Sequence, residues 1–159
     1  MTDNRSSRRV GLLVASLGLI TTGVHHFLLF LYPRYFIGTE SARMAYLDSW
    51  FSLVSTIGLS LRFVVIPLLA AIGGFYLVHL DKEPVQQVAG WFLISGFIVG
   101  LGIPILDWIV SEPSFQMSLS ATLQYGGLTM ISIALPALVA ATLGHFSDDR
   151  SRTLPTEST

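Results

Sequence analysis

Six polar side chains interrupt otherwise apolar stretches, and they are the residues whose types could do chemistry. They are His25, His26, Arg62, Asp107, Gln124 and Tyr125. Polar groups at membrane depth need partners, because hydrocarbon offers no hydrogen bonds. Histidine titrates near neutral pH, so an aspartate with two histidines and a tyrosine could relay protons or hold a polar ligand. We therefore expect the six residues to form one polar cluster with a binding role, in the outer third of a bilayer.

A purely structural role for this cluster is the main alternative. Asp107 and Arg62 are each the only charge in their crossing segment, and an unpaired charge in hydrocarbon is costly. We therefore expect them to be each other's main charged partners. The histidines would then bond to Tyr125, to Gln124 or to backbone carbonyls.

In two alternatives, histidine side chains act as metal ligands. His25, His26 and Asp107 could ligate an ion, although adjacent helical residues point about 100° apart and seldom share one. His79 and His145 lie at equal depth near the ends of their helices, which would allow a bis-histidine haem. Histidine at a helix C-terminus is also explained by the helix dipole. We predict no metal and no cofactor, with haem as the alternative.

The composition excludes several classes of protein. Of 159 residues, 52% are hydrophobic and 12% are charged, whereas an ordinary soluble domain is about 25% charged. The formal net charge is −1 and the longest basic run is Arg8 and Arg9, which excludes a nucleic-acid binder. The chain has no cysteine, so disulfides and thiolate metal sites are excluded. These features predict an integral membrane protein.

Four stretches are long and apolar enough to cross a bilayer, which takes about 20 residues. Three crossings are unambiguous and cover residues 10–32, 88–110 and 119–146. They predict an all-α, integral membrane four-helix bundle that forms one domain. Residues 1–9 would then be a cytoplasmic N-terminal segment, and residues 147–159 a disordered cytoplasmic tail.

The second crossing has two interpretations, because Arg62 is the only charge between Trp50 and Leu80. We prefer a crossing at residues 61–80, kinked at Pro67, with an outer interfacial helix over residues 41–60. Arg62 would then lie near the interface, where a charge costs less than at the bilayer centre. The alternative is a single long tilted helix with Arg62 near its middle.

Lysine and arginine set the expected orientation in the cell membrane. The side that holds both termini carries six of them, namely Arg5, Arg8, Arg9, Lys82, Arg150 and Arg152. The opposite side carries Arg34 and Arg43, with Arg62 at its rim. Cytoplasmic loops hold the excess of these residues, so both termini are expected in the cytoplasm.

Small residues mark the faces expected to pack, because they let helix backbones approach in lipid. The first crossing has a stripe of Gly11, Ala15, Gly18 and Thr22, and the third has a GxxxG motif at Gly96 and Gly100. In the fourth crossing the expected face is Ala121, Tyr125, Ser132 and Pro136. On the second helix, Arg62 is expected to lie over Gly73 and Tyr76.

These features favour a non-catalytic membrane subunit, or an interaction or binding protein. The sequence has no glycine-rich phosphate loop, no HExxH and no GxSxG motif, so an enzyme is not favoured. A small oligomeric transporter or proton-linked carrier is the first alternative, and a membrane haem or redox protein is the second. Polar groups gather on one side of the midplane, which favours binding over transport. The expected partners are the lipid bilayer and a second copy or a membrane complex.

Overall fold

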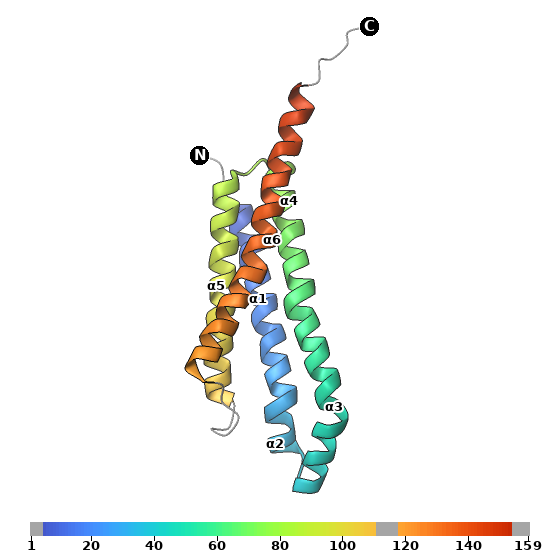
Figure 1. Cartoon of the computed structure of the whole chain (residues 1–159). Helices are drawn as coiled ribbons and strands as arrows, with labels where there is room; N and C mark the ends of the chain where they lie inside the picture. Colours follow the sequence, from blue (N-terminus) through green and yellow to red (C-terminus); the bar gives the residue numbers. More distant parts are fainter. Residues whose placement is uncertain (1–4, 111–117, 154–159) are drawn as a thin grey trace.

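The computed structural model describes residues 5–110 and 118–153, and every regular element in these ranges is helical (Figure 1). The helices are α1 (Arg5–His26), α2 (Tyr32–Phe36), α3 (Glu40–Ser60), α4 (Ile66–His79), α5 (Val85–Val110) and α6 (Leu119–Thr153). Two π-helical turns, η1 (Phe27–Leu31) and η2 (Leu61–Val65), join α1 to α2 and α3 to α4. The expected fold class is confirmed: the chain is an all-α four-helix bundle.

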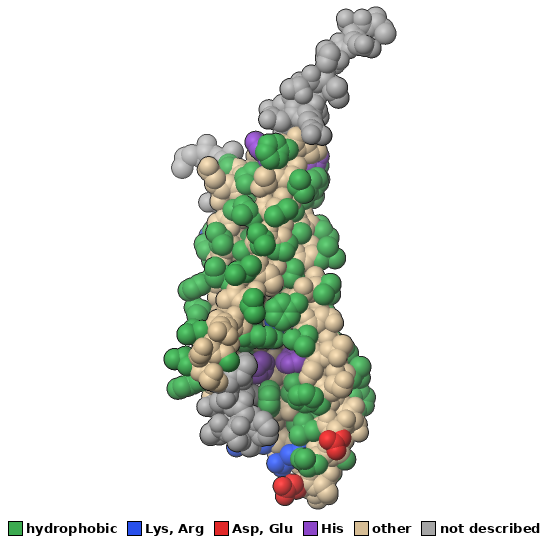
Figure 2. Space-filling model, viewed as in Figure 1, with side chains coloured by type: hydrophobic (Ala, Val, Ile, Leu, Met, Phe, Trp, Pro, Cys, Tyr) green, Lys and Arg blue, Asp and Glu red, His purple; other side chains and the backbone are tan. Residues whose placement is uncertain are grey.

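Four helical segments of the described chain are long and apolar enough to cross a membrane. They are Ser6–Phe36, Glu40–His79, Val85–Leu106 and Leu119–Ser147. Hydrophobic side chains cover the middle of the molecule, while the visible charged ones gather at the end where α2 meets α3 (Figure 2). Helix α1 begins and α6 ends at the other end (Figure 1). The arrangement is that of a multi-pass membrane protein.

The structure of the second crossing contradicts the preferred interpretation, an interfacial helix followed by a separate crossing. Glu40–His79 is one continuous segment of 40 residues, so no boundary separates an interfacial helix over residues 41–60 from a crossing at residues 61–80. The alternative, one long helix, is the one that forms. At a rise of 1.5 Å per residue it is about 60 Å long, roughly twice the hydrocarbon core of a bilayer. Its polar first turns, with Glu40, Arg43 and Asp48, can therefore extend beyond the hydrocarbon.

Proline explains why the two long segments bend into π turns instead of breaking. Tyr32 and Pro33 follow η1, and Ile66 and Pro67 follow η2 in the same way. A proline ring clashes with the carbonyl four residues earlier and has no N–H to donate. A wider turn relieves this clash, and in η1 the Tyr32 N–H bonds to the Phe27 carbonyl five residues back. The helix therefore continues through each proline.

Glycines bring α6 into backbone contact with α5 and α4. A Cβ added at Gly126 would lie 2.6 Å from the carbonyl oxygen of Gly100, and one added at Gly100 would lie equally close to that of Gly126. A Cβ at Gly74 would lie 2.5 Å from the Ala137 carbonyl oxygen. Such approaches are possible only without a side chain, and they maximise dispersion contacts between helices in lipid.

The buried faces agree with the expected ones on α1 and α5 and differ on α6. Gly11, Ala15, Gly18 and Thr22 are buried, as are Gly96 and Gly100. On α6 the buried face is instead Thr122, Gly126, Thr129, Ile133, Ala137 and Ala141. The expected residues Ala121, Tyr125, Ser132 and Pro136 are half-buried at its edge. The backbone contact at Gly126 fixes this rotation of α6.

The turn between α4 and α5 is tied to the start of α1. Lys82 has a φ of 57°, in the left-handed region, and Glu83 follows it. One carboxylate oxygen of Glu83 accepts a hydrogen bond from the Ser7 N–H at 3.1 Å. A carboxylate at this position satisfies a free N–H group of the first helical turn and complements the helix dipole. Glu83 therefore caps α1 from another part of the chain.

The first and last helices both extend beyond the predicted crossings. Helix α1 already begins at Arg5, and α6 continues to Thr153, into the segment expected to be a disordered tail. No glycine or proline interrupts the sequence between Phe146 and Pro155, so nothing there stops the helix. Residues 154–159 lie outside the described residues.

Candidate functional site

Arg62 is a buried cation near the middle of the long Glu40–His79 segment. Its side chain is 4% exposed. Nη1 donates to the Tyr125 hydroxyl at 2.9 Å, and Nη2 donates to the Thr22 hydroxyl at 3.0 Å. The guanidinium carbon also lies 5.4 Å from the centre of the Tyr125 ring, within cation–π range. One charge thus joins α1, η2 and α6 through neutral hydroxyl groups.

Two histidines follow Thr22 along α1. The His26 ring is buried, and its Nδ1 lies 2.9 Å from the Thr22 carbonyl oxygen. The His25 ring meets the His26 ring edge-on, with 5.8 Å between their centroids. The His25 Nδ1 is buried without a hydrogen-bond partner among the described residues. His25 packs directly on Gly58 of α3, where any added Cβ would collide with the ring.

Turn η2 brings Arg62 onto the buried side of its segment. Turn η1 starts directly after His26, and turn η2 contains Arg62. One extra residue in a helix rotates everything beyond it by about 100°. Without that rotation Arg62 would lie over Gly73 and Tyr76, and the Tyr76 side chain is 50% exposed. With it, Arg62 falls on the same side as Ala70, which is fully buried.

Two of the six expected cluster residues are placed differently or not described. Gln124 is exposed on α6 and lies outside the cluster. The Asp107 side chain lies outside the described residues, and with it the expected pair with Arg62 and the expected third metal ligand. The sequence assigns Thr22 only to a packing stripe, yet its hydroxyl binds the guanidinium. Its position one helical turn before His25 and His26 was the signal that could have found it.

His79 and His145 lie where α4 and α6 come close together. Figure 2 shows histidine side chains at two heights of the molecule. The His79 ring stacks on Phe75 of the same helix, with 5.1 Å between centroids. Beside it, a Cβ at Gly144 would lie 3.1 Å from the Phe75 carbonyl oxygen, so α4 and α6 touch here.

An apolar groove opens next to the cluster, between α1 and α3. Its volume is about 250 Å³, and its walls include Val24 and Leu28 from α1 and Val54 and Ile57 from α3. His25 forms part of the same wall. His25 and Thr21 are therefore the polar side chains that line an otherwise apolar groove.

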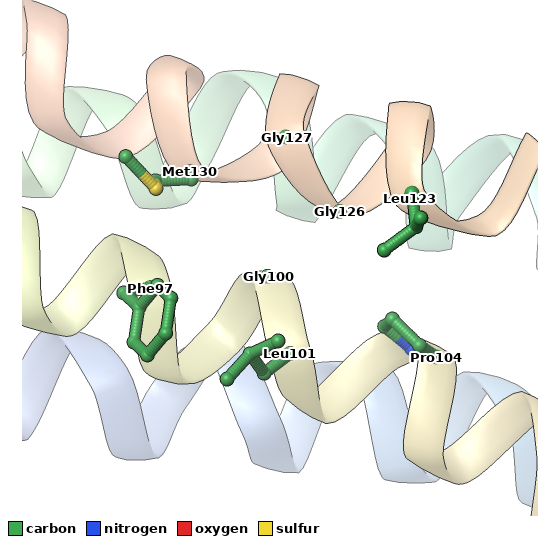
Figure 3. Close-up of a pocket in the computed structure, with 8 residues that line it drawn as sticks. All are labelled: Phe97, Gly100, Leu101, Pro104, Leu123, Gly126, Gly127 and Met130. Carbon is green, nitrogen blue, oxygen red and sulfur yellow. The ribbon is translucent and has the colours of Figure 1, made fainter. Parts of the chain in front are cut away.

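A second groove lies between α5 and α6 and has no comparable polar wall. Its volume is about 140 Å³, and Phe97, Leu101 and Pro104 face Leu123 and Met130 across it (Figure 3). These side chains are apolar, so the groove offers contact area to lipid and no chemistry. The candidate site is therefore the Arg62 cluster, defined from here on as Thr22, His25, His26, Arg62 and Tyr125.

No protein-family model matches this chain, and comparisons with curated proteins and with solved structures find no match either. The fold and the composition define a class, that of a four-span α-helical membrane protein. Within that class, the particular feature of this chain is a cluster built around one buried arginine.

Proposed function

We propose that this protein is a non-catalytic membrane subunit or binding protein, and that its Arg62 cluster recognises an anionic group inside the bilayer. The supporting observation is the burial of Arg62 against the hydroxyls of Tyr125 and Thr22. A guanidinium has five N–H donors and a permanent charge. Its Nε is buried without a hydrogen-bond partner in the described part of the chain. Charged side chains inside a membrane are costly and commonly mark a binding site or pathway.

Apolar packing in the rest of the bundle favours binding over transport. The fully buried side chains toward the other end include Leu77 of α4, Phe92 of α5 and Ala141 of α6. The buried hydroxyls of Ser95 and Thr129 bond to backbone carbonyls of α1, α5 and α6. They are therefore engaged in packing, whereas a polar pathway would need groups free to bind what passes.

A comparison of co-purified small molecules tests this proposal. Wild-type protein, Arg62→Gln and the control Arg9→Gln would be purified in a non-ionic detergent, and their organic extracts compared by mass spectrometry. Arg9 is exposed on α1, so the control removes the same charge away from the cluster. We expect an anionic compound with the wild type and Arg9→Gln, and at least about tenfold less with Arg62→Gln, which corresponds to a loss of about 1.4 kcal/mol of binding.

Two further variants keep the result interpretable. Arg62→Lys retains the charge without the planar fork, and we expect it to retain part of the bound compound. Asp107→Asn removes the carboxylate that the sequence predicts as the partner of Arg62, so it should increase or preserve binding if the site takes an external anion. The same extract from wild type and from a folded Arg62→Gln protein would contradict the proposal.

The proposal also covers the kind of membrane, the orientation of the chain in it and the partners of the protein. The distribution of lysine and arginine supports a cell-membrane protein with both termini in the cytoplasm and the cluster in the outer third of the bilayer. A second copy or a membrane complex would cover part of the apolar exterior. Because the chain has no cysteine, Asp81→Cys and Glu40→Cys can each carry a single label. Labelling of Asp81→Cys from outside intact cells would show that the orientation is the reverse of the proposed one.

A further inference from the structure

Gln124 is a polar side chain that points out of the bundle. It lies two residues after Thr122 and two residues before Gly126, both of which are buried. Two residues correspond to about 200° around a helix, so Gln124 lies on the side of α6 opposite its packed face. Its amide forms no hydrogen bond to another described residue. The described part of the bundle therefore leaves this amide without a partner.

The exposed surface on both sides of Gln124 along α6 is apolar. Leu119, nearer the outer end of the helix, is 71% exposed, and Leu128, one turn in the other direction, is 59% exposed. Large apolar side chains on the exterior of a membrane-spanning helix face lipid, which places the amide between them at hydrocarbon depth. Lipid tails offer no hydrogen bonds, so an amide at this depth is costly until another protein chain binds it.

The residues that share this side of α6 form a seam for a second helix. Gln124, Gly127, Ile131 and Leu135 follow one another at intervals of three or four residues, and all four are exposed. Such intervals keep side chains on one face and are typical of helices that pack side by side. Gly127 has no side chain, and a Cβ added there would meet nothing within 4 Å. The space beside Gln124 is therefore open to a side chain of another chain.

A glutamine amide is complementary to a second glutamine amide. Its oxygen accepts hydrogen bonds and its NH₂ group donates them, so two such groups can satisfy each other. Copies of one membrane protein share their orientation and depth in the bilayer. A twofold axis normal to the membrane therefore brings the same position of α6 in two copies face to face at the same height. A charged partner group would instead leave its charge without a counter-charge at Gln124.

We propose that the protein forms a parallel homodimer in the membrane through the exposed face of α6, with the Gln124 amides of the two copies hydrogen-bonded to each other. A single polar residue in an apolar seam fixes the register of two helices, and Gln124 would have this role. The dimer does not depend on an anion at Arg62. It goes beyond the proposed function by identifying the partner and the surface that it covers.

The dissociation constant of the dimer is the first test. It would be measured by sedimentation equilibrium of the purified protein in a non-ionic detergent that matches the density of the solvent. Interhelical hydrogen bonds of polar side chains strengthen association in membranes, so Gln124→Leu should raise the constant by about tenfold. Gln124→Asn keeps an amide and should lie closer to wild type. Thr56→Leu is the control, because it removes an exposed polar side chain from α3.

Disulfide cross-linking in membranes tests the face without altering Gln124. The chain has no cysteine, so each variant carries a single one and can be cross-linked only to a second copy. Ile131→Cys and Leu135→Cys should form cross-linked dimers on oxidation. Leu13→Cys on α1 and Leu68→Cys on α4 are the controls, since these residues are 59% and 57% exposed on other helices. They should form at least about tenfold less cross-linked product.

The outcomes that would overturn the inference are distinct from those that bear on the anion site. A wild-type protein that stays monomeric at all concentrations would contradict the dimer. Cross-linking as strong at Leu68→Cys as at Ile131→Cys would mean that α6 is not the interface, and an unchanged constant in Gln124→Leu would mean that the amide does not hold it. Arg62→Gln should dimerise like wild type, so loss of the co-purified anion without loss of the dimer separates the two proposals.

Discussion

The α5–α6 contact and the Arg62 cluster hold helices together by opposite means. At Gly100 and Gly126 two backbones meet directly, and neither position has room for a methyl group. At Arg62, three helical elements are bridged by a charged side chain, and a groove opens beside them. Packing alone explains the first region. Packing alone does not explain a buried charge, which is costly inside a membrane, and this difference makes the Arg62 cluster the candidate site.

The largest effect is expected at the glycine contact. Gly126→Ala should lower the free energy of unfolding by about 3 kcal/mol, at the upper end of overpacking costs, because the clashing atom belongs to the rigid α5 backbone. Gly127→Ala is the control on the same helix, since an added Cβ there meets nothing within 4 Å. Thermal unfolding in detergent measures both. Similar losses in the two variants would mean that α5 and α6 are not in backbone contact.

A smaller loss is expected at the cluster. Tyr125→Phe removes the hydroxyl that accepts from Arg62 and leaves a buried N–H of a charged group without it. Hydrogen bonds to charged groups contribute about 1.5–3 kcal/mol, so we expect a loss of about 2 kcal/mol. Tyr76→Phe, at a half-exposed position on α4, should change stability by less than about 0.5 kcal/mol. Equal stability of Tyr125→Phe and wild type would mean that the Tyr125 hydroxyl does not help to hold Arg62.

The smallest of these effects is expected at the cap of α1. Glu83→Ala removes the carboxylate that accepts from the Ser7 N–H and should cost about 1 kcal/mol, as loss of a helix cap does. Asp81→Ala is the control in the same turn. Asp81 is exposed near the C-terminus of α4, where a negative charge is unfavourable, so its removal should be neutral or slightly stabilising. A greater loss in Asp81→Ala would contradict the cap.

Much of the fold could be predicted because apolar length is a strong constraint in this chain. A charge-poor run of about 20 residues must be helical to satisfy its backbone in lipid. The long second segment was harder, because the cost of a buried arginine favoured a break near Leu61. Hydrogen bonds to Tyr125 and Thr22 offset that cost, and they join residues that lie far apart in the sequence.

The site could be predicted in part, because a polar residue stands out within an apolar stretch of sequence. Arg62, Tyr125, His25 and His26 stand out in this way, but Thr22 does not, since threonine is common in packing faces. Gln124 directly precedes Tyr125 in the sequence, but its side chain is exposed on a different side of α6. The small residues of α6 allow several faces, and only the contact at Gly126 selects among them. A proline follows each π turn in the sequence. Pro104 and Pro136, however, lie inside α-helices, so a proline alone does not predict a π turn.

A double-mutant cycle on Arg62 and Tyr125 tests the central claim most directly. Arg62→Leu removes the charge, and Thr22 keeps its other hydrogen bond, to the Gly18 carbonyl. The double variant Arg62→Leu with Tyr125→Phe therefore has neither a buried charge nor an unpaired phenol. We predict that it loses less stability than Tyr125→Phe alone, because breaking a buried polar pair costs more than replacing both partners by apolar groups. Losses that simply add would mean that Arg62 is held by other groups, and the cluster described here would be wrong.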